Sequence, residues 1–305
     1  MLKLANQDIK TLHIEPTDAC NAACPQCARE TDNSFDKANI HHLTVDRLLE
    51  VVEVETIQNL EKLLLCGNYG DPAAGKYTMD ILKFVRCINP NITIGMNTNG
   101  GLRDVSWWAE LANLNKVFYR KEERLEDYVI WSIDGLADTN HLYRVNVEWN
   151  KVMSNAQAFI DAGGRAHWEM LVFEHNQHQV KQAEQLAKDM GFKFFRAKVS
   201  KRFKTYPVEF LHPPTTWQDP VVEYGNVDCH ALKDSSLYLS AKGILYPCCW
   251  LGINSDYTLD KFDSIQQSWH TDSPNKTCWQ NCAKNDNGTS FTNQWQHEVK
   301  FQIAT

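Results

Sequence analysis

The sequence lacks any long uninterrupted hydrophobic run. No apolar stretch reaches the roughly 18 residues needed to cross a bilayer, and the segment from Met1 to Asp8 lacks the apolar core of a secretory signal peptide. Lysine and arginine form no dense block, and 31 Lys+Arg against 38 Asp+Glu leave a net charge of −7. We therefore expect a cytoplasmic protein that binds neither a membrane nor, non-specifically, nucleic acid.

The sequence also shows no internal repeat and no disordered composition. Hydrophobic residues make up 43% and aromatic residues 11% of the chain, whereas disordered chains are poor in both. A length of 305 residues allows one large α/β domain or two smaller ones. These features predict a globular protein with a substantial core.

Cysteine, by contrast, is abundant and clustered. Of ten cysteines, three lie close together near the start of the chain and five lie between positions 229 and 282. Without an export signal, disulfides would meet a reducing compartment, so the two groups indicate metal sites. Cys87, which falls in a helical stretch, and Cys66 are the candidates for ordinary core cysteines.

Short β-rich runs alternate with helical patterns over the first 200 residues. The predicted strands are Thr11–Glu15, Lys62–Cys66, Asn91–Met96, Tyr128–Ile133, Ala166–Phe173 and Phe192–Val199. This alternation predicts parallel strands joined by right-handed crossovers. Six strands are too few for a complete eight-fold barrel, so we expect an α/β fold with a partial (β/α)6 barrel. Active residues are then expected at the carboxyl ends of the strands.

Three of the predicted helices have clear boundaries. Thr44 is a candidate N-cap for a helix whose apolar face begins at Val45. A second apolar stripe begins at Val152 and stops at Gly163 and Gly164, and a third stops at Gly191.

The pattern changes after about residue 200. Residues 201–228 contain four prolines and no clear period, which predicts a connecting segment. The runs 237–240 and 244–246 flank Ala241-Lys242-Gly243 and predict a β-hairpin. The last stretch, 283–305, is polar and rich in Asn and Gln and is left without a structural prediction.

The first cysteine group has the spacing C-x3-C-x2-C. Cys20, Cys24 and Cys27 follow directly on the first predicted strand and supply three thiolates from one loop. A 4Fe-4S cluster normally takes four cysteines, so three would leave one iron free to bind another ligand. The alternative is a zinc loop, but zinc usually takes a fourth Cys or His nearby, and none follows at the expected distance.

Five segments in order resemble the radical S-adenosylmethionine (radical SAM) superfamily over about residues 10–200. They are His13–Asn21, Gly67–Pro72, Asn97–Gly100, Ile130–Gly135 and Arg144. Each follows or ends a predicted strand. The resemblance implies that SAM is bound by Gly67, Gly70, Asp71, Pro72, Asn97, Asn99, Ser132, Asp134 and Arg144. Two residues depart from the family pattern: Gln26 stands where an aromatic residue is usual, and Asp71 stands where Glu is commoner.

The resemblance also implies a reaction. In the family, the turn that Gly67–Pro72 matches receives the methionine amino group of SAM, and Arg144 is placed to pair with its carboxylate. The open iron chelates SAM, and one electron from the reduced cluster cleaves it to methionine and a 5′-deoxyadenosyl radical. That radical abstracts a hydrogen atom from the substrate, while the protein positions the groups and excludes water.

The second cysteine group resembles the family's C-terminal auxiliary-cluster modules, called SPASM and twitch. Its members are Cys229, Cys248, Cys249, Cys278 and Cys282, and the predicted hairpin lies between the first two. Five cysteines are too few for two clusters, whereas Cys229, Cys248, Cys278 and Cys282 would ligate one second, auxiliary 4Fe-4S cluster. A structural zinc site is the alternative, and Cys249 is an alternative ligand to Cys248. The expected domains are a radical SAM domain over 1–200, the connecting segment 201–228, and an auxiliary domain over 229–305.

The resemblance narrows the substrate to two classes. We expect a peptide or protein that is oxidised, cross-linked or epimerised, and the alternative is oxidation or rearrangement of a small polar metabolite. Cys66 and Cys249 are candidate catalytic thiols that return a hydrogen atom. An electron donor such as flavodoxin or ferredoxin is the expected partner. A hypothesis of another class is a non-catalytic metal-binding scaffold that does not cleave SAM.

Overall fold

The structure is a computed structural model that describes residues 9–115, 117–120, 123–200, 202–218, 223–253, 255–283 and 302–303. Within these ranges the strands are β1 (Thr11–Ile14), β2 (Lys62–Leu65), β3 (Thr93–Thr98), β4 (Val117–Arg120), β5 (Glu123–Glu126), β6 (Tyr128–Ser132), β7 (Ala166–Val172), β8 (Phe194–Val199), β9 (Ser236–Leu239), β10 (Leu245–Tyr246) and β11 (Gln302–Ile303). The helices are α1 (Ala28–Thr31), α2 (Val45–Val51), α3 (Val54–Asn59), α4 (Thr78–Ile88), α5 (Val105–Leu114), α6 (Asn140–Tyr143), α7 (Trp149–Asp161), α8 (Val180–Met190), α9 (His230–Lys233), α10 (Phe262–Ser268) and α11 (Lys276–Cys282).

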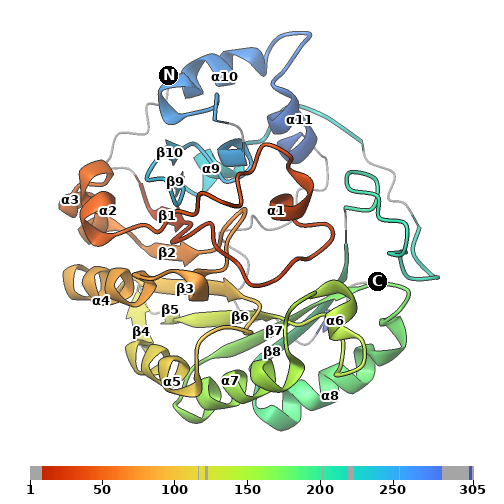
Figure 1. Ribbon diagram of the computed structural model, residues 1–305. Helices are drawn as coiled ribbons and strands as arrows, with labels where there is room; N and C mark the ends of the chain where they lie inside the picture. Colours follow the sequence, from red (N-terminus) through yellow and green to blue (C-terminus); the bar gives the residue numbers. More distant parts are fainter. Residues whose placement is uncertain are drawn as a thin grey trace.

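The six predicted strands form one parallel sheet in the order β1-β2-β3-β6-β7-β8. Helices α2 to α5, α7 and α8 lie along one side of this curved sheet (Figure 1). The sheet does not close, because β8 pairs with β11 and β1 pairs with β9 rather than with each other. The prediction of an α/β fold with a partial barrel is therefore confirmed.

The predicted hairpin is present, and it extends the same sheet. Strands β9 and β10 are antiparallel to each other, and β9 runs parallel to β1 with Thr11 opposite Ser236. The connecting segment before it has no helix or strand among its described residues. The domain boundaries at 200 and 228 remain predictions. Of the unplaced stretch 283–305, only Ala283 and the backbone of β11 belong to the described residues.

The helix boundaries follow the expected local chemistry. The Thr44 side chain accepts a hydrogen bond from the Arg47 backbone nitrogen and caps α2. Helix α8 ends at Gly191, whose left-handed conformation (φ 94°) suits a residue without a Cβ. One local prediction is wrong: Cys87 lies on α4 but is exposed, because the apolar face of that helix is formed by Ile81, Leu82 and Val85.

The two faces of the sheet differ in chemistry. Alternate residues of each strand point to opposite sides, and the register aligns residues of one kind across neighbouring strands. One set is apolar and packs in the main core: Leu12, Ile14, Leu63, Leu65, Ile94, Met96, Val129, Trp131, Trp168, Met170, Phe195 and Ala197. The other set is largely polar: Thr11, His13, Lys62, Asn97, Ser132, His167, Glu169, Arg196 and Lys198. The helices cover the apolar set, so the polar set faces the inside of the partial barrel.

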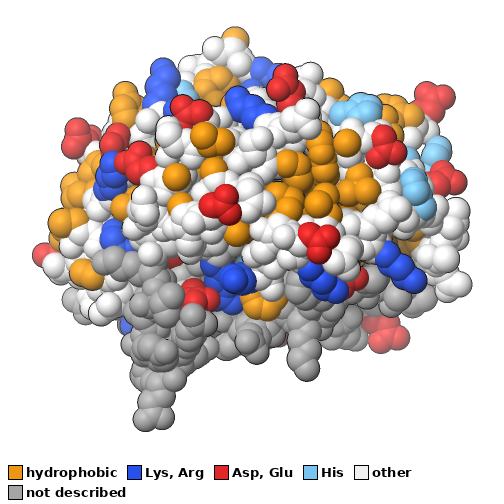
Figure 2. Space-filling view, turned by 90° about the horizontal axis from the view of Figure 1, so that it is seen from below, with side chains coloured by type: hydrophobic (Ala, Val, Ile, Leu, Met, Phe, Trp, Pro, Cys, Tyr) orange, Lys and Arg blue, Asp and Glu red, His pale blue; other side chains and the backbone are white. Residues whose placement is uncertain are grey.

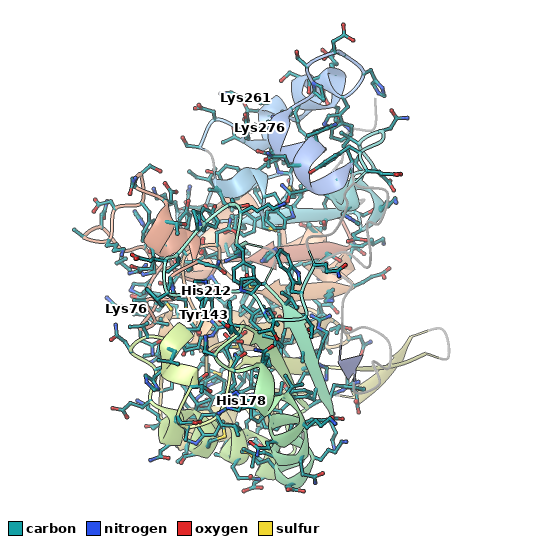
Figure 3. All side chains as sticks on the ribbon, turned by 90° about the vertical axis from the view of Figure 1, so that its right-hand side faces the viewer. Lys76, Tyr143, His178, His212, Lys261 and Lys276 are labelled. Atoms are coloured by element: carbon teal, nitrogen blue, oxygen red, sulfur yellow. The ribbon has the colours of Figure 1, made fainter. Side chains whose placement is uncertain are left out.

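The outer layers complete the molecule. The segment with α10 and α11 forms one end, marked by Lys261 and Lys276, and His178 lies toward the opposite end (Figure 3). Hairpin β4–β5 projects from the body in the same view. Seen from the side of α7 and α8, the surface mixes charges of both signs with apolar side chains (Figure 2). In the described residues, no helix is long and apolar enough to span a membrane.

Lys62 shows the energetic consequence of a polar barrel interior. Its side chain is fully buried at the start of β2, with its ammonium 5.4 Å from the centre of the Tyr128 ring. Burial lowers the pKa of Lys62 to about 7, although the negative charge of Asp234 opposes this shift. The group is therefore poised to lose its proton near neutral pH.

This pKa predicts a pH-dependent stability. Between about pH 7 and 10 the unfolded chain binds a proton at Lys62 that the folded chain does not, so the stability of the native protein rises with pH over this window. Lys62→Met removes that dependence. We expect the free energy of unfolding of Lys62→Met to exceed that of the wild type most at pH 7. The difference should shrink by a few kcal/mol (~1.4 per pKa unit) toward pH 10, because the wild type becomes more stable over this range. Urea titrations at several pH values measure it, and a pH-independent difference would contradict the assignment.

Candidate functional site

The first three cysteines lie together on the loop that follows β1. Cys27 immediately precedes α1, and its backbone nitrogen donates to the carbonyl of Cys24 at 2.9 Å. Burial raises the pKa of Cys20 to about 12 and that of Cys24 to about 11, and the neighbouring thiols add to both shifts because of their proximity. Iron binding therefore has to displace these protons. The loop brings the three side chains together, as their spacing predicts.

Two side chains from later in the chain, Asn99 just after β3 and Arg144 just after α6, donate toward the sulfurs. The Asn99 Nδ2 lies 3.6 Å from Cys20 Sγ, and the Arg144 Nη1 lies 3.7 Å from Cys24 Sγ. Hydrogen bonds to sulfur and a nearby cation both favour a negatively charged iron–sulfur cluster. In the described part of the chain, no three His, Cys, Asp or Glu side chains surround a single point as ligands of one ion would. The three thiolates and the two donors beside them suit an iron–sulfur cluster, in which each thiolate binds a different iron.

The glycine turn Gly67–Pro72 follows β2 and packs directly on the cysteine loop. A Cβ on Gly70 would lie 1.8 Å from the carbonyl oxygen of Thr17, and a Cβ on Gly67 would lie 2.3 Å from Glu15 Oε1. The Asp71 backbone nitrogen donates to the Ala19 carbonyl at 2.8 Å. The family resemblance implies that this turn receives the methionine amino group of SAM. In the structure these glycines also allow the turn to approach the cysteine loop.

The Asp71 carboxylate joins this turn to the end of β3. It accepts hydrogen bonds from the backbone nitrogens of Ala73 (2.9 Å) and Asn99 (2.7 Å) and from the Thr98 hydroxyl (3.0 Å). Burial raises the pKa of Asp71, and these donors oppose the shift. Pro72 is buried at the start of the short 3-10 helix Pro72–Ala74. Asp71 is therefore placed next to the cysteine loop, but its oxygens already bind the protein's own donors.

The predicted residues of β3 and β6 lie in two different settings. Asn99 is 4% exposed, and its amide also donates to the Asn21 Oδ1 at 2.9 Å, so it is part of the cysteine loop's support. Asn97 and Ser132 belong to the inner face of the sheet. The side-chain oxygen of Asn97 is buried and has no hydrogen-bond partner among the described residues. An acceptor in that state marks a position where a ligand's donor would be stabilised.

Asp134 and Arg144 form a buried ion pair. The Arg144 Nε donates to Asp134 Oδ2 at 2.6 Å, and the other carboxylate oxygen accepts from the Leu171 backbone nitrogen. Burial raises the pKa of Asp134 above its ordinary value, and the adjacent guanidinium only partly opposes this shift. Asp134 thus orients Arg144 so that its Nη1 reaches Cys24. The predicted contacts of the two residues with SAM remain predictions.

Four of the five later cysteines line one cavity. Cys229 precedes α9, Cys248 follows β10, and Cys278 and Cys282 lie one turn apart on the same face of α11. The cavity has a volume of about 30 Å³, and its other walls are mostly apolar, including Val227, Leu251 and Phe262. Cys249 does not line it. The arrangement favours Cys248 over Cys249 as the fourth member of this group.

Cys249 instead lies on the side of the glycine turn, near Cys66. Its carbonyl accepts a hydrogen bond from the Asn68 Nδ2 at 2.9 Å. Cys66 directly follows β2, and its carbonyl accepts from His13 Nε2 at 2.6 Å. Burial raises the pKa of the Cys66 thiol, and the neighbouring Cys249 and Glu15 raise it further. The structure therefore brings together the two cysteines proposed as catalytic.

Two functional features of the site were not identified in the sequence. Gln26, noted only as a departure from the family pattern, is fully buried; its Oε1 accepts from the Ser200 hydroxyl at 2.8 Å and its Nε2 donates to the Tyr206 carbonyl at 3.2 Å. It thereby fastens the cysteine loop to the end of β8. Because its partners lie more than 170 residues away, no local pattern reveals this role.

The second feature is a charged group on the inner face. Glu169 on β7 pairs with Arg196 and Lys198 on β8, with Lys198 Nζ 2.6 Å from the carboxylate. Burial raises the pKa of Glu169, but the two cations outweigh it and leave that pKa below its ordinary value. Charges at every second position, Arg196 and Lys198, within a predicted strand are the sequence signal that identifies an inward-facing polar row.

The tight contact of Gly70 predicts a severe effect of a single methyl group. Gly70→Ala places its Cβ against backbone atoms of the cysteine loop, which no side-chain rotation relieves. Gly163→Ala is the matched control, because a Cβ there meets open space and is disfavoured only by its left-handed backbone (φ 89°). We expect the control to lose about 1–2 kcal/mol of unfolding free energy and Gly70→Ala to lose more and to retain less iron. Equal losses in denaturant titrations would contradict the packing argument.

Residues 14–187, more than half of the chain, match the family model of the radical SAM superfamily. No curated protein matches the chain. Among solved structures, the chain is similar to Streptococcus suis SuiB bound to its precursor peptide SuiA, with a TM-score of 0.58 and 12% identity over 87% of this chain and 65% of SuiB.

A second similar structure is anSMEcpe with bound AdoMet. Its TM-score is 0.54, with 17% identity over 83% of this chain and 73% of that protein. The same protein with AdoMet and the Kp18Cys peptide gives 0.52, with 16% identity over 91% and 81% of the two chains. At such identities the likeness shows the fold alone, and the chain spans 65% of the length of SuiB. The family match over residues 14–187 carries the assignment: the chain belongs to the radical SAM superfamily.

Proposed function

We propose that this chain binds a SAM-cleaving 4Fe-4S cluster through Cys20, Cys24 and Cys27. The observation that carries the proposal is the convergence of three parts at the carboxyl edge of the sheet: the cysteine loop, the glycine turn packed on it, and the Asn99 and Arg144 donors beside the sulfurs. When bound and reduced, the cluster would supply the electron for cleavage of SAM to methionine and a 5′-deoxyadenosyl radical.

The surrounding residues would orient SAM. The backbone of Gly67–Asp71 provides the surface for the amino group, and Arg144 has guanidinium nitrogen left, beyond its bond to Asp134, for the SAM carboxylate. Asn97 and Ser132 lie on the inner face of the sheet. Substrate would therefore bind within the partial barrel, where Glu169, Arg196 and Lys198 provide charges.

The substrate that we propose is a peptide or protein. The solved neighbours support this class, because SuiB was solved with a precursor peptide and anSMEcpe with the Cp18Cys and Kp18Cys peptides. A small polar metabolite is the second candidate, and the charged group on the inner face favours it because fixed charges suit recognition of a compact polar ligand. An electron donor such as flavodoxin or ferredoxin would reduce the cluster.

We further propose that Cys229, Cys248, Cys278 and Cys282 hold an auxiliary 4Fe-4S cluster in a twitch-like module. Their convergence on one cavity supports a shared ligand, and four thiolates suit either a cluster or zinc. The proposed domains are 1–200 and 229–305, joined by 201–228. An auxiliary cluster would accept the electron that substrate oxidation releases.

Metal content and SAM cleavage test both sites together. We expect about eight iron per chain after anaerobic reconstitution, with about four in a Cys20/Cys24/Cys27→Ala variant, and 5′-deoxyadenosine from the wild type alone. About four iron and one zinc in the wild type would leave the radical chemistry and make the second site structural. A fully loaded wild type that forms no 5′-deoxyadenosine would favour the non-catalytic scaffold.

The same measurement separates the two adjacent cysteines. Cys248→Ala should lose about four iron, whereas Cys249→Ala, the matched control from the next position, should keep the wild-type content. The reason is that, of these two adjacent cysteines, Cys248 lines the cavity and Cys249 does not. The opposite result would assign Cys249 as the ligand.

We also propose that Cys66 or Cys249 returns a hydrogen atom when the reaction is an epimerisation; one electron from the proposed electron donor and one proton would then convert the resulting thiyl radical back to the thiol. Both lie beside the glycine turn, and a thiol hydrogen exchanges with solvent. Product made in deuterium oxide should then carry one deuterium at the reacting carbon, and alanine at the donor cysteine should abolish that label. Unlabelled product from the wild type would exclude a thiol donor and favour oxidation.

A further inference from the structure

The carboxylate of Glu15 connects two parts of the chain that are far apart in sequence. Glu15 follows β1 and is 2% exposed. Its Oε1 accepts hydrogen bonds from the backbone nitrogens of Tyr69 (2.7 Å) and Gly70 (3.0 Å), and its Oε2 accepts one from the Tyr238 hydroxyl at 2.8 Å. One carboxylate therefore holds the glycine turn on one side and the C-terminal hairpin on the other.

The Tyr238 hydroxyl is held in place by its surroundings. The residue lies on β9, is 1% exposed, and packs edge-on against His13 with ring centres 4.9 Å apart. A Cβ on Gly252 would lie 2.5 Å from the Tyr238 ring, so the chain that follows Cys249 presses on the same side chain. The hydroxyl cannot move without a shift of the hairpin or of this segment.

Two further contacts join the glycine turn to the C-terminal segment. The Asn68 side chain donates to the Cys249 carbonyl at 2.9 Å. The Tyr69 hydroxyl lies 3.5 Å from the Ile253 carbonyl and donates to Asp32 at 2.7 Å. The turn proposed to receive the amino group of SAM is therefore in contact with the segment that carries the second cysteine group.

We propose that Tyr238 is a positioning residue for SAM, acting through Glu15 on the Gly67–Asp71 turn. This inference rests on the proposed SAM site. Without the tyrosine hydroxyl, Glu15 Oε2 would be buried without a donor, which favours reorientation of the carboxylate away from the Tyr69 and Gly70 nitrogens. The turn would then lose the acceptor that orders it. By linkage, changes in the C-terminal segment would alter SAM affinity, and bound SAM would in turn stabilise that segment.

The test compares two tyrosines of one hairpin. Tyr238→Phe removes the hydroxyl that binds Glu15, whereas Tyr246→Phe is the control, because Tyr246 is 4% exposed on β10 and its hydroxyl makes no hydrogen bond within the described residues. The probe is radiolabelled SAM, measured by anaerobic equilibrium dialysis on fully reconstituted protein. We expect the Kd to rise about tenfold for Tyr238→Phe and less than twofold for Tyr246→Phe, with equal iron in both.

The separate effects on KM and kcat distinguish a positioning role of Tyr238 from a general loss of structure. In SAM cleavage without added substrate, KM for SAM should rise more than kcat falls in Tyr238→Phe. An unchanged Kd in Tyr238→Phe, or an equal rise in both variants, would overturn the inference. Wild-type protein that neither binds nor cleaves SAM would instead overturn the proposed function, so the two failures are distinguishable.

If Tyr238→Phe loses iron, a second pair of variants, at Glu15, tests the same inference. Glu15→Gln keeps an oxygen that accepts from the Tyr69 and Gly70 nitrogens, whereas Glu15→Leu has similar volume and no acceptor. We expect Glu15→Gln to bind SAM within about threefold of the wild type and Glu15→Leu to bind it at least tenfold more weakly. Equal affinities would show that the acceptor does not order the turn and would overturn the inference.

Discussion

The proposed SAM site depends on the direct contact between the backbones of two loops. The glycine turn after β2 lies against Thr17 of the cysteine loop, at a distance that only a residue without a side chain permits. Buried carboxylates close this contact on both sides: Glu15 binds the turn from β1, and Asp71 binds the end of β3. Because these acceptors satisfy backbone donors that would otherwise be buried without partners, the loops are held as one rigid unit.

The sheet beneath these loops has one apolar and one polar face, because alternate residues of each strand point to opposite sides. One face is apolar and anchors the helices, with Trp108, Trp131 and Phe159 in mutual contact at the centre. The other face carries polar and charged side chains that pair across neighbouring strands, as Glu169 does with Lys198. Burying charge is unfavourable unless it is paired, and the ion pairs of Glu169 with Arg196 and Lys198 meet this condition.

The C-terminal segment is continuous with the proposed site in structure. Strand β9 extends the parallel sheet at β1. Of the two cysteines after β10, Cys248 lines the cavity shared with Cys229, Cys278 and Cys282, and Cys249 lies by the glycine turn. The same contacts make the second cysteine group a structural neighbour of the first.

The sequence alone determined the six strands, the helix ends at Thr44 and Gly191, and the cysteine spacing, because periodicity, capping and loop spacing are local properties of the chain. It did not predict the exposure of Cys87, which depends on which helical face meets the sheet. Nor did it identify the roles of Glu15 and Gln26 or separate Cys248 from Cys249. Only the tertiary structure decided these, because Glu15 meets Tyr238 across 223 positions and Gln26 meets Ser200 across 174. Such contacts exist only once the sheet has formed.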